Sequence, residues 1–583
     1  MNRISVREII SAGNPGFLHG FPFFFKELLF LFIEKIIHQD EINKFISQNS
    51  DKMNFELIDE LFEYLDFSFQ VSSKDRDKIP SEGKLICVSN HPFGGLDGLI
   101  LLKMFSEIRH DVKIVVNNIL LHIENLRQLF IPFDIMNRKI SKESIVEIGK
   151  YLSSGNAVIF FPAGEVSRFS FKGIKDSKWN KGAVYFAEKY NAPVLPVYIS
   201  GKNSLFFYLA SKINKNLSIF LLPHELFNKS SKIATVKIGD YIPSSSFSSS
   251  VYKKNVQIKL LKKHVYFLAK NKKVFNTEKN VIHPVDKKLL KKQLYNCEVL
   301  GFTEDKKTIF VAAYNNCPLI IREISRLREI TFRKVGEGTG KRMDLDRFDR
   351  TYKHLILWDE KELEIVGSYR IGICSEIIEE SGIDGLYTST LFNISGMDKY
   401  LPYSIELGRS FIQSKYWTTN ALDYLWQGIG SFLLKNQNIC YMFGGVSLSN
   451  SYNEEAKNLI IYFFNKWFGF EGLAESRNKY IIPSSYLNEF QTLFENKNYL
   501  EELQIIKKRL KFLGFSVPTL YKQYTELCET GGIKFLDFGI DPDFNNCIDG
   551  LILVEVDKIK KSKKERYMKN STLHTDSSYT KAL

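Results

Sequence analysis

Short apolar runs alternate with amphipathic stretches in the first part of the chain. Five such runs predict strands between Lys84 and Ile242, and they read KLICVSN, VKIVVNN, AVIFFPAG, APVLPVYISG and ATVKIGDYI. Runs that are apolar throughout, with helical stretches between them, are typical of a mainly parallel sheet covered by helices on both faces. The first part is therefore predicted to be an α/β unit.

A second α/β pattern begins near Glu298. Its predicted strands are TIFVAAY, a hairpin in HLILWDEKELEIVGSYRIGI that turns at Asp359–Glu362, SIELGRSFI, YMFGGVSL and LILVEV. Helical periodicity predicts helices at Pro318–Val335, Trp417–Lys435 and Glu454–Phe468.

Changes of composition divide the two patterns. A chain of 583 residues is too long for one hydrophobic core, and the run PSSSFSSS at Pro243–Ser250 followed by a lysine-rich stretch marks a break. We expect a first domain at 1–270, a basic linker at 271–297, a second domain at 298–557 and a disordered basic tail at 558–583.

The apolar segment Phe21–Ile37 contains four charged residues, Lys26, Glu27, Glu34 and Lys35. These charges exclude a membrane-spanning helix, and no small-residue cleavage site follows as a signal peptide would require. Two interpretations stay open, a helix lying in the membrane interface and an ordinary core helix of the first domain.

The net charge of +14 indicates an anionic partner, although a charge run can also be a solvated face. The sequence has no zinc-finger, RNA-recognition or helix-turn-helix signature, so nucleic acid is not the expected partner. Seven scattered cysteines without a C-x-x-C pair predict neither a disulfide framework nor a metal site, and they suit a reducing compartment.

The first candidate site follows the strand LICVSN. It reads Asn90-His91-Pro92-Phe93-Gly94-Gly95-Leu96-Asp97, and a helix comes next. His91 is a candidate general base because its imidazole titrates near neutral pH. The glycines would let Asp97 fold back and orient that ring, as in a catalytic triad; capping of the helix is the alternative role for Asp97.

A second loop carries polar groups at the end of the strand AVIFF. It reads Phe161-Pro162-Ala163-Gly164-Glu165-Val166-Ser167-Arg168. Ligands of open α/β sheets bind at the carboxyl ends of strands. Glu165 and Arg168 could therefore hold a phosphate or a polar acceptor, with Arg168 as a bidentate clamp.

These blocks resemble the glycerolphosphate and lysophospholipid acyltransferase family over about Lys84–Pro243. His91 and Asp97 approach its His-x4-Asp block with one extra residue, and Ala163 stands where Glu is usual. Both departures are similar to the subgroup related to ornithine-lipid O-acyltransferases. The resemblance implies that His91 deprotonates an acceptor hydroxyl, that Asp97 orients it, and that Asn90, Gly94, Gly164, Glu165 and Arg168 bind substrate.

The second candidate site is spread over the C-terminal half. The helix SRLREITFRKVGEGTG carries Arg328, Phe332 and Glu337, and the strand SIELGRSF carries Glu406 and Arg409. The pattern Gly428-Ile429-Gly430 near a predicted helix start would let backbone N–H groups approach a phosphate. A structural ion pair is the alternative role for Glu406 and Arg409.

Five blocks (LREITF, ELGRSF, LWQGIGSFL, MFGGVSLS and DPDFNNCIDGLILVEV) together resemble the hemolysin-like branch of the GNAT acyltransferases over Glu298–Val556. This branch includes ornithine- and glycine-lipid N-acyltransferases, and it implies an α/β fold with a mixed sheet. Leu425 occupies the place where GNAT enzymes carry Gln or Arg, which favours acyl carrier protein over coenzyme A as the donor. The resemblance implies that Glu406 takes a proton from an amine, that Arg409 holds a carboxylate, and that Arg328, Gly428 and Gly430 bind substrate.

Together the two halves predict a bifunctional aminolipid synthase at the cytoplasmic face of the inner membrane. Its C-terminal half would attach a 3-hydroxyacyl group to an amino acid, and its N-terminal half would esterify the new lyso-lipid. It would bind no resident cofactor, and its partners would be acyl carrier protein and an anionic membrane surface. Two alternatives stay open: a lysophospholipid acyltransferase whose C-terminal half only binds lipid or carrier, and a basic non-enzymatic binding protein.

Overall fold

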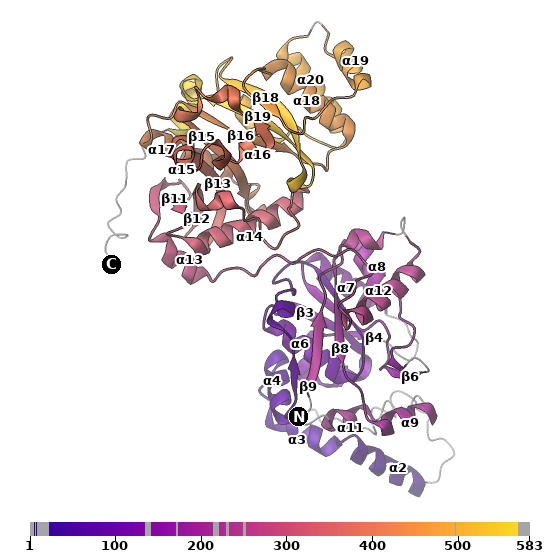
Figure 1. Cartoon of the computed structure of the whole chain (residues 1–583). Coiled ribbons are helices and arrows are strands. Elements are labelled where there is room, and N and C mark those ends of the chain that lie inside the picture. Colours follow the sequence, from indigo (N-terminus) through magenta and orange to yellow (C-terminus); the bar gives the residue numbers. More distant parts are fainter. Residues whose placement is uncertain are drawn as a thin grey trace. The chain divides into compact units, whose positions relative to one another are not determined.

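The computed structural model describes residues 5, 7, 23–133, 141–170, 173–213, 221–228, 233–248, 252–495 and 497–568. The chain forms two compact units, Met1–His283 and Pro284–Leu583; Figure 1 colours the chain continuously from indigo at the N-terminus to yellow at the C-terminus. Their boundary falls inside the segment expected to link two domains.

The first unit is built on a seven-stranded sheet. In spatial order its strands are β1 (Ser68–Gln70), β9 (Ile233–Ile238), β8 (Val194–Ser200), β2 (Leu85–Ser89), β5 (Ala157–Phe160), β3 (Val112–Asn117) and β4 (Phe130–Phe133). All neighbouring pairs are parallel except β8 and β9. The predicted mainly parallel sheet is confirmed. Besides the five predicted strands it contains two short strands, β1 and β4, at its edges.

Helices cover both faces of this sheet. On one face α4 (Asn54–Tyr64) and α6 (Gly95–Ser106) pack against inward side chains such as Cys87. On the other, α7 (Lys142–Ser153), α8 (Gly182–Lys189) and α12 (Lys254–Leu268) pack against their neighbours such as Val88. Because successive strand residues point to opposite faces, both faces are apolar and β2 is buried along its whole length.

Shorter elements complete the first unit. They are α3 (Gln39–Gln48), α5 (Ser73–Arg76), α9 (Leu205–Ile213), α11 (Leu222–Phe227) and the hairpin of β6 (Arg168–Ser170) and β7 (Gly173–Lys175).

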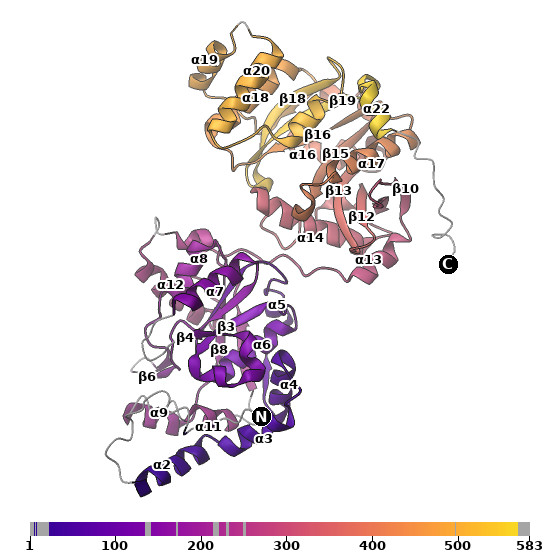
Figure 2. The ribbon, with the colours of Figure 1, turned by 180° about the vertical axis from the view of Figure 1, so that it is seen from behind.

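The predicted N-terminal helix is α2 (Phe23–Ile36), and residues 21–22 of the predicted segment lie outside the described residues. Figures 1 and 2 both place α2 alongside α9 and α11, and its Ile36 packs against the cluster formed by Phe207 and Tyr208. Of the helices in the described part of the chain, none is long and apolar enough to cross a membrane.

The second unit is built on an eight-stranded mixed sheet. Its strands in spatial order are β10 (Glu298–Phe302), β11 (Thr308–Ala313), β12 (Lys353–Asp359), β13 (Glu364–Ile373), β15 (Ser404–Ile412), β16 (Tyr441–Leu448), β19 (Cys547–Glu555) and β18 (Ile533–Asp541). The only parallel pair among these described strands is β15 with β16. The mixed sheet was expected from the resemblance and is confirmed.

Helix α14 (Pro318–Val335) covers one face of this sheet, and α17 (Ala421–Lys435) and α18 (Glu454–Phe468) cover the other. Helix α17 begins four residues later than predicted, because residues 417–420 form a turn after a 3-10 helix at Ser414–Tyr416. The remaining elements are α15 (Cys374–Ser381), α16 (Thr388–Leu391), β14 (Phe392–Asn393), β17 (Glu475–Ser476), α19 (Ser484–Leu493), α20 (Tyr499–Phe512) and α21 (Thr519–Thr525).

Two further helices occupy segments that were expected to be irregular. The expected linker contains α13 (Lys287–Leu294), whose Leu290 and Leu294 pack into the core beside α14. The start of the expected disordered tail forms α22 (Lys561–Tyr567), where Tyr567 is buried beside Trp426 of α17. Apolar residues at helical spacing inside charged runs explain both differences. Residues 569–583 of the predicted tail lie outside the described residues.

Candidate active sites

The first site lies in the loop between β2 and α6. Asp97 folds back as the glycines permit, and its Oδ2 lies 3.0 Å from Nδ1 of His91. The imidazole stacks on Phe161 with ring centroids 4.2 Å apart, and its side chain is 17% exposed. The ring is thus fixed on one side by a carboxylate and keeps Nε2 for a reacting hydroxyl.

Asp97 is fully buried, and its carboxylate has two roles at once. Besides facing His91, Oδ2 accepts hydrogen bonds from the backbone N–H groups of Phe93 (2.8 Å) and Gly94 (2.9 Å). Burial raises the pKa of Asp97, and the contact with His91 partly offsets that rise. The two interpretations left open by the sequence, an orienting carboxylate and a helix cap, are therefore both realised by one side chain.

Asn90 has a different place from the one expected of a substrate ligand. Its side chain donates to the carbonyl of Ile199 (2.8 Å) and accepts from the same residue's N–H (2.8 Å). Asn90 is buried, so its amide joins the ends of β2 and β8 and holds the start of the His91 loop.

The loop that carries Gly164, Glu165 and Arg168 meets the His91 loop. The N–H of Ser167 donates to the His91 carbonyl (2.7 Å), and Gly164 has a positive φ of 65° where the loop turns. Nε of Arg168 lies 3.4 Å from Oε2 of Glu165, and both side chains are partly exposed. Both loops leave parallel neighbours, β2 and β5, at their carboxyl ends, so the polar groups predicted from the sequence share one edge of the sheet.

Asp176 is a residue of this site that the sequence did not indicate. Its Oδ1 accepts from the backbone N–H of His91 (3.2 Å) and from the hydroxyl of Ser167 (2.5 Å). Its Oδ2 accepts from the indole N–H of Trp179 (2.8 Å). A lone Asp in the run KDSKW has no distinguishing spacing, so only the fold shows that it joins the His91 loop to the Ser167 loop.

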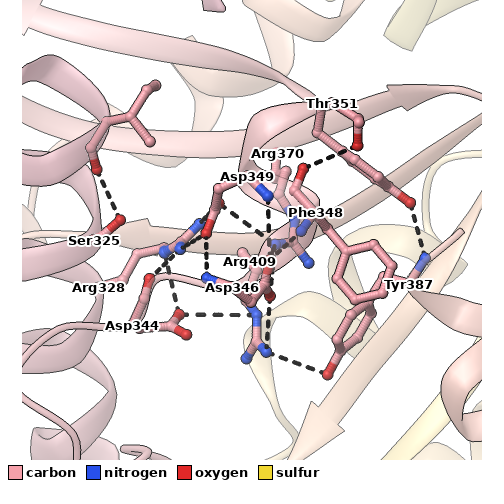
Figure 3. A network of polar contacts seen from close by, with 12 residues as sticks. Ser325, Arg328, Asp344, Asp346, Phe348, Asp349, Thr351, Arg370, Tyr387 and Arg409 are labelled. Carbon is pink, nitrogen blue, oxygen red and sulfur yellow. Dashed lines mark hydrogen bonds and ion pairs between the residues drawn. The ribbon is translucent and has the colours of Figure 1, made fainter. Parts of the chain in front are cut away.

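The second site contains a buried network of alternating charges, shown in Figure 3. Arg328 donates to both carboxylate oxygens of Asp349 (2.8 and 2.9 Å), and its Nε lies 3.1 Å from Asp344. Arg370 donates to both oxygens of Asp346, each at 2.8 Å. These arginines hold the pKa of Asp349 far below its usual value against the opposing effect of burial. Because Arg328 has no exposed surface, its role is to fix the loop after α14 rather than to contact substrate.

Arg409 is the arginine of this network with the longest ion-pair contacts. It lies 3.8 Å from Asp344, 3.6 Å from Asp346 and 3.3 Å from the hydroxyl of Tyr387. Its guanidinium stacks between the rings of Tyr387 and Phe544. Arg409 sits at a β-bulge in β15 with a positive φ of 49°, which turns it out of the ladder. A guanidinium held by rings and long contacts can still take up a carboxylate.

Glu406 is buried and surrounded by donors. Its Oε1 accepts from the N–H and the hydroxyl of Thr388 (both 2.7 Å), and its Oε2 accepts from the hydroxyl of Tyr352 and the N–H of Tyr387 (3.2 Å). Four donors use up the lone pairs of a carboxylate. This geometry speaks against the expectation that Glu406 takes a proton from an amine, and it favours a role in anchoring Tyr387 beside Arg409.

Strands β15 and β16 separate immediately beyond Glu406. They pair with each other only from Ser404 to Glu406. On their other sides, β15 is paired with β13 and β16 is paired with β19 along most of their length. A Cβ on Gly408 would meet no atom within 4 Å, and Gly445 is exposed on the opposite strand. We call the stretch beyond Glu406, where the facing edges of β15 and β16 have no ladder partner among the described residues, the opening between β15 and β16; at its start the strands are still close, because a Cβ on Gly444 would lie 2.0 Å from the Leu407 carbonyl oxygen.

The two glycines of the LWQGIG block lie in the interior of α17 rather than at its start. A Cβ on Gly428 would lie 2.9 Å from Leu355, and one on Gly430 would lie 2.1 Å from the Tyr567 carbonyl. Both glycines are buried, and they permit close packing of α17 on the sheet and on α22. The expected phosphate contact has no support in this geometry, because helix-interior N–H groups are already bonded within the helix.

Comparisons with known proteins assign a family to each unit. A family model described as "Acyltransferase" matches residues 17–274, and one described as "Acetyltransferase (GNAT) domain" matches residues 327–427. A glycine N(alpha)-acyltransferase of Bacteroides thetaiotaomicron is 35% identical over 49% of this chain and 89% of the relative. A lyso-glycine lipid O-acyltransferase of the same species is 33% identical over 38% of this chain and 82% of the relative.

The chain belongs to the acyltransferases.

This acyltransferase is also similar to an L-ornithine N(alpha)-acyltransferase of Agrobacterium fabrum, with 28% identity over 19% of this chain and 39% of the relative. The enzyme therefore joins, in one chain, regions related to two kinds of acyltransferase that occur as separate proteins in Bacteroides thetaiotaomicron.

Proposed function

We propose that this acyltransferase makes a doubly acylated aminolipid in two steps. The second unit N-acylates an amino acid with a 3-hydroxyacyl group, and the first unit O-acylates the hydroxyl that this group brings. The observation that carries the proposal is that one chain is similar to two separate relatives, one named for N-acylation of glycine and one named for O-acylation of a lyso-glycine lipid. The His91–Asp97 pair and the open β15–β16 edge supply chemistry for each step.

In the O-acylation, His91 takes the proton from the lyso-lipid hydroxyl. Asp97, 3.0 Å from Nδ1, favours the tautomer whose Nε2 accepts that proton and stabilises the imidazolium that forms. The alkoxide attacks the thioester carbonyl, and the imidazolium returns its proton to the leaving sulfur. Asp176 keeps the His91 backbone in place during this exchange.

In the N-acylation, the opening between β15 and β16 is the place for the extended arm of the acyl donor. Unpaired strand edges can hydrogen-bond to the amide groups of such an arm as a further strand would. The α-carboxylate of the acceptor pairs with Arg409. Glycine is the acceptor that the comparisons favour, since the glycine enzymes match nearly their whole length and the ornithine enzyme matches 39% of its own.

The reaction needs an activated acyl donor, and we propose acyl carrier protein, with coenzyme A as the alternative. Leu425 lies buried inside α17 and offers no polar group for a pyrophosphate. An acidic carrier protein also suits the net charge of +14.

We further propose that the first unit rests on the cytoplasmic face of an anionic membrane through α2 and α9. Their exposed apolar side chains lie at one end of this unit, and they are Phe24, Leu28, Leu31, Phe32, Leu205, Phe206 and Leu209. On α2 these residues recur at helical spacing, which makes one apolar stripe. The buried sides of α2 and α9 share a cluster with Val166 of the Arg168 loop, which connects these two helices to the loop of the first site.

The test is mass spectrometry of lipids from a host that lacks aminolipids and expresses this chain. The intact chain should yield a diacylated amino-acid lipid, and His91→Ala should replace it with the mono-acylated lyso-lipid. Diacylated lipid from the His91→Ala chain would refute His91 as the base. Altered phospholipid acyl chains without any aminolipid would instead favour a lysophospholipid acyltransferase whose second unit only binds donor or lipid.

A further inference from the structure

Glu337 lies at the opening between β15 and β16, although the sequence places it more than 60 residues before either strand. Helix α14 ends in a Schellman-type turn in which Gly336 has a φ of 81° and the N–H of Glu337 donates to the Phe332 carbonyl (2.8 Å). The residue at this place of the turn normally packs an apolar side chain back onto the helix. Here it is a carboxylic acid that is only 8% exposed.

The turn is fixed against the far end of the sheet. Ser449 donates to the Val335 carbonyl (2.6 Å), and the side chain of Asn545 donates to the Gly336 carbonyl (2.7 Å). The hydroxyl of Ser447 on β16 donates to Oε2 of Glu337 (3.1 Å), and it is the only recorded hydrogen-bond donor to that side chain among the described residues. On the other strand, the charge of Arg409 acts on the same carboxyl group. Glu337 thus contacts β16 through Ser447, and the charge of Arg409 on β15 favours its ionised form.

We propose that Glu337 is the general base of N-acylation, with Ser447 orienting its carboxylate, and this inference rests on the function proposed above. An amino acid whose carboxylate pairs with Arg409 would place its amine beside Glu337. The carboxylate keeps lone pairs for that amine, whereas Glu406 has all of its own occupied.

Glu337 accepts one proton from the ammonium group and releases it to water. The free amine attacks the thioester carbonyl, so that a C–N bond forms. Glu337 then takes the second proton from the tetrahedral nitrogen and passes it to the sulfur as the C–S bond breaks. The products are the amide, the free thiol and one proton.

The surroundings of Glu337 suit a group that exchanges protons near neutral pH. Burial raises its pKa to about 7, while Ser447 and Arg409 oppose that rise. The other groups whose ionisation is coupled to it are Asp549 and Cys547 on β19, Tyr452 after β16, and Tyr521 on α21. Asp549, opposite Ser447 in the strand register, has its pKa raised to about 7 by burial and by the charges of Asp541 and Glu337.

The experiment measures N-acylation of glycine by the full-length chain against pH, as release of thiol from a 3-hydroxyacyl donor. The wild type should gain activity as pH rises through about 7, because the basic form of Glu337 then accumulates. Glu337→Gln should lose roughly 10²- to 10⁴-fold in kcat together with this limb of the profile. Hydroxylamine, which is already unprotonated at neutral pH, needs only the second of the two proton transfers, so Glu337→Gln should lose much less activity with hydroxylamine than with glycine.

Two controls keep the outcomes distinct. O-acylation of supplied lyso-lipid by the first unit of the same Glu337→Gln chain should be unchanged, which shows that the chain is intact, and an unchanged denaturant unfolding of the second unit excludes misfolding around Glu337. Asp549→Asn should shift the limb to lower pH, since it removes a like charge, without abolishing activity. The inference is overturned if the activity of Glu337→Gln still rises with pH through about 7 as in the wild type. It is also overturned if Asp549→Asn, rather than Glu337→Gln, abolishes that rise. A wild-type chain that acylates no amine at any pH would instead refute the proposed function itself.

Discussion

At the scale of single residues, two buried carboxylates of the second unit differ in their hydrogen bonding. Glu406 is held by four donors and cannot take on another partner, whereas Glu337 has Ser447 as its one donor and faces the opening between two strands. The same chemical group is therefore saturated with donors in one place and, in the other, keeps acceptor capacity for the proton transfer that we propose. Hydrogen-bond supply, rather than residue type, separates the two roles.

Glu406→Gln should therefore lower stability before it affects chemistry. An amide offers one acceptor oxygen to four donors and turns its own NH₂ toward two of them, so we expect a loss of roughly 2–4 kcal/mol in the free energy of unfolding of the second unit. Denaturant unfolding of the purified chain measures this loss. A variant of wild-type stability that fails to N-acylate would show instead that Glu406 takes part in the reaction.

Some site residues could be predicted from the sequence and others could not. His91 and Asp97 are close in the chain, and glycines between them leave few ways to turn, so their contact was predictable. Glu337 and Ser447 are brought together by the turn after α14 and the order of strands in the sheet, and no spacing indicates this. Gly428 and Gly430 show the converse, because a motif known from phosphate-binding loops serves here for helix packing.

At the scale of elements, the strands that are apolar throughout were predictable, because burial on both faces leaves a clear pattern. The short strands β1 and β4 were not predictable from the sequence, because three or four residues are too few to show a periodic pattern of apolar positions. Helix α2 shows a further limit. Its sequence fitted both a core helix and an interfacial one, and only the exposure of one stripe while Ile33 and Ile37 are buried distinguishes the two faces.

Replacing Leu28 and Leu31 of α2 by Glu should weaken binding to anionic vesicles roughly 10²-fold, since both side chains are more than half exposed and free to enter the interface. Vesicle sedimentation of the full-length chain measures the effect. Val146→Glu on α7 is the matched control, because Val146 is similarly exposed but lies away from the stripe. Equal binding by the Leu28/Leu31 variant would exclude α2 as the docking element.

At the scale of the whole molecule, the chain is two compact units that meet at His283 and Pro284. Relatives of different parts of this chain exist as separate proteins, and helices α13 and α22 pack against α14 and α17 of the second unit. The division into two units was predictable from the two runs of strands. The exact ends of the second unit were not predictable, because the few apolar residues that pack α13 and α22 into the core lie in segments made mostly of charged residues.

Residues 284–583 expressed alone should N-acylate glycine with a kcat within a few-fold of the full chain. Adding residues 1–283 as a second polypeptide should restore the diacylated product. Thiol release and lipid mass spectrometry measure the two steps separately. If the isolated second unit is folded but inactive, the first unit contributes to N-acylation and the two sites are not independent.

The union of the two units has a consequence for the cell that makes this enzyme. Because each chain carries one site of each kind, the ratio of the two activities is set by their turnover numbers and cannot be changed by gene expression. A cell with separate enzymes can raise its lyso-lipid by making less of the second one. With this chain, only substrate supply or a change at one of the two sites alters the balance between the single-chain and double-chain lipid.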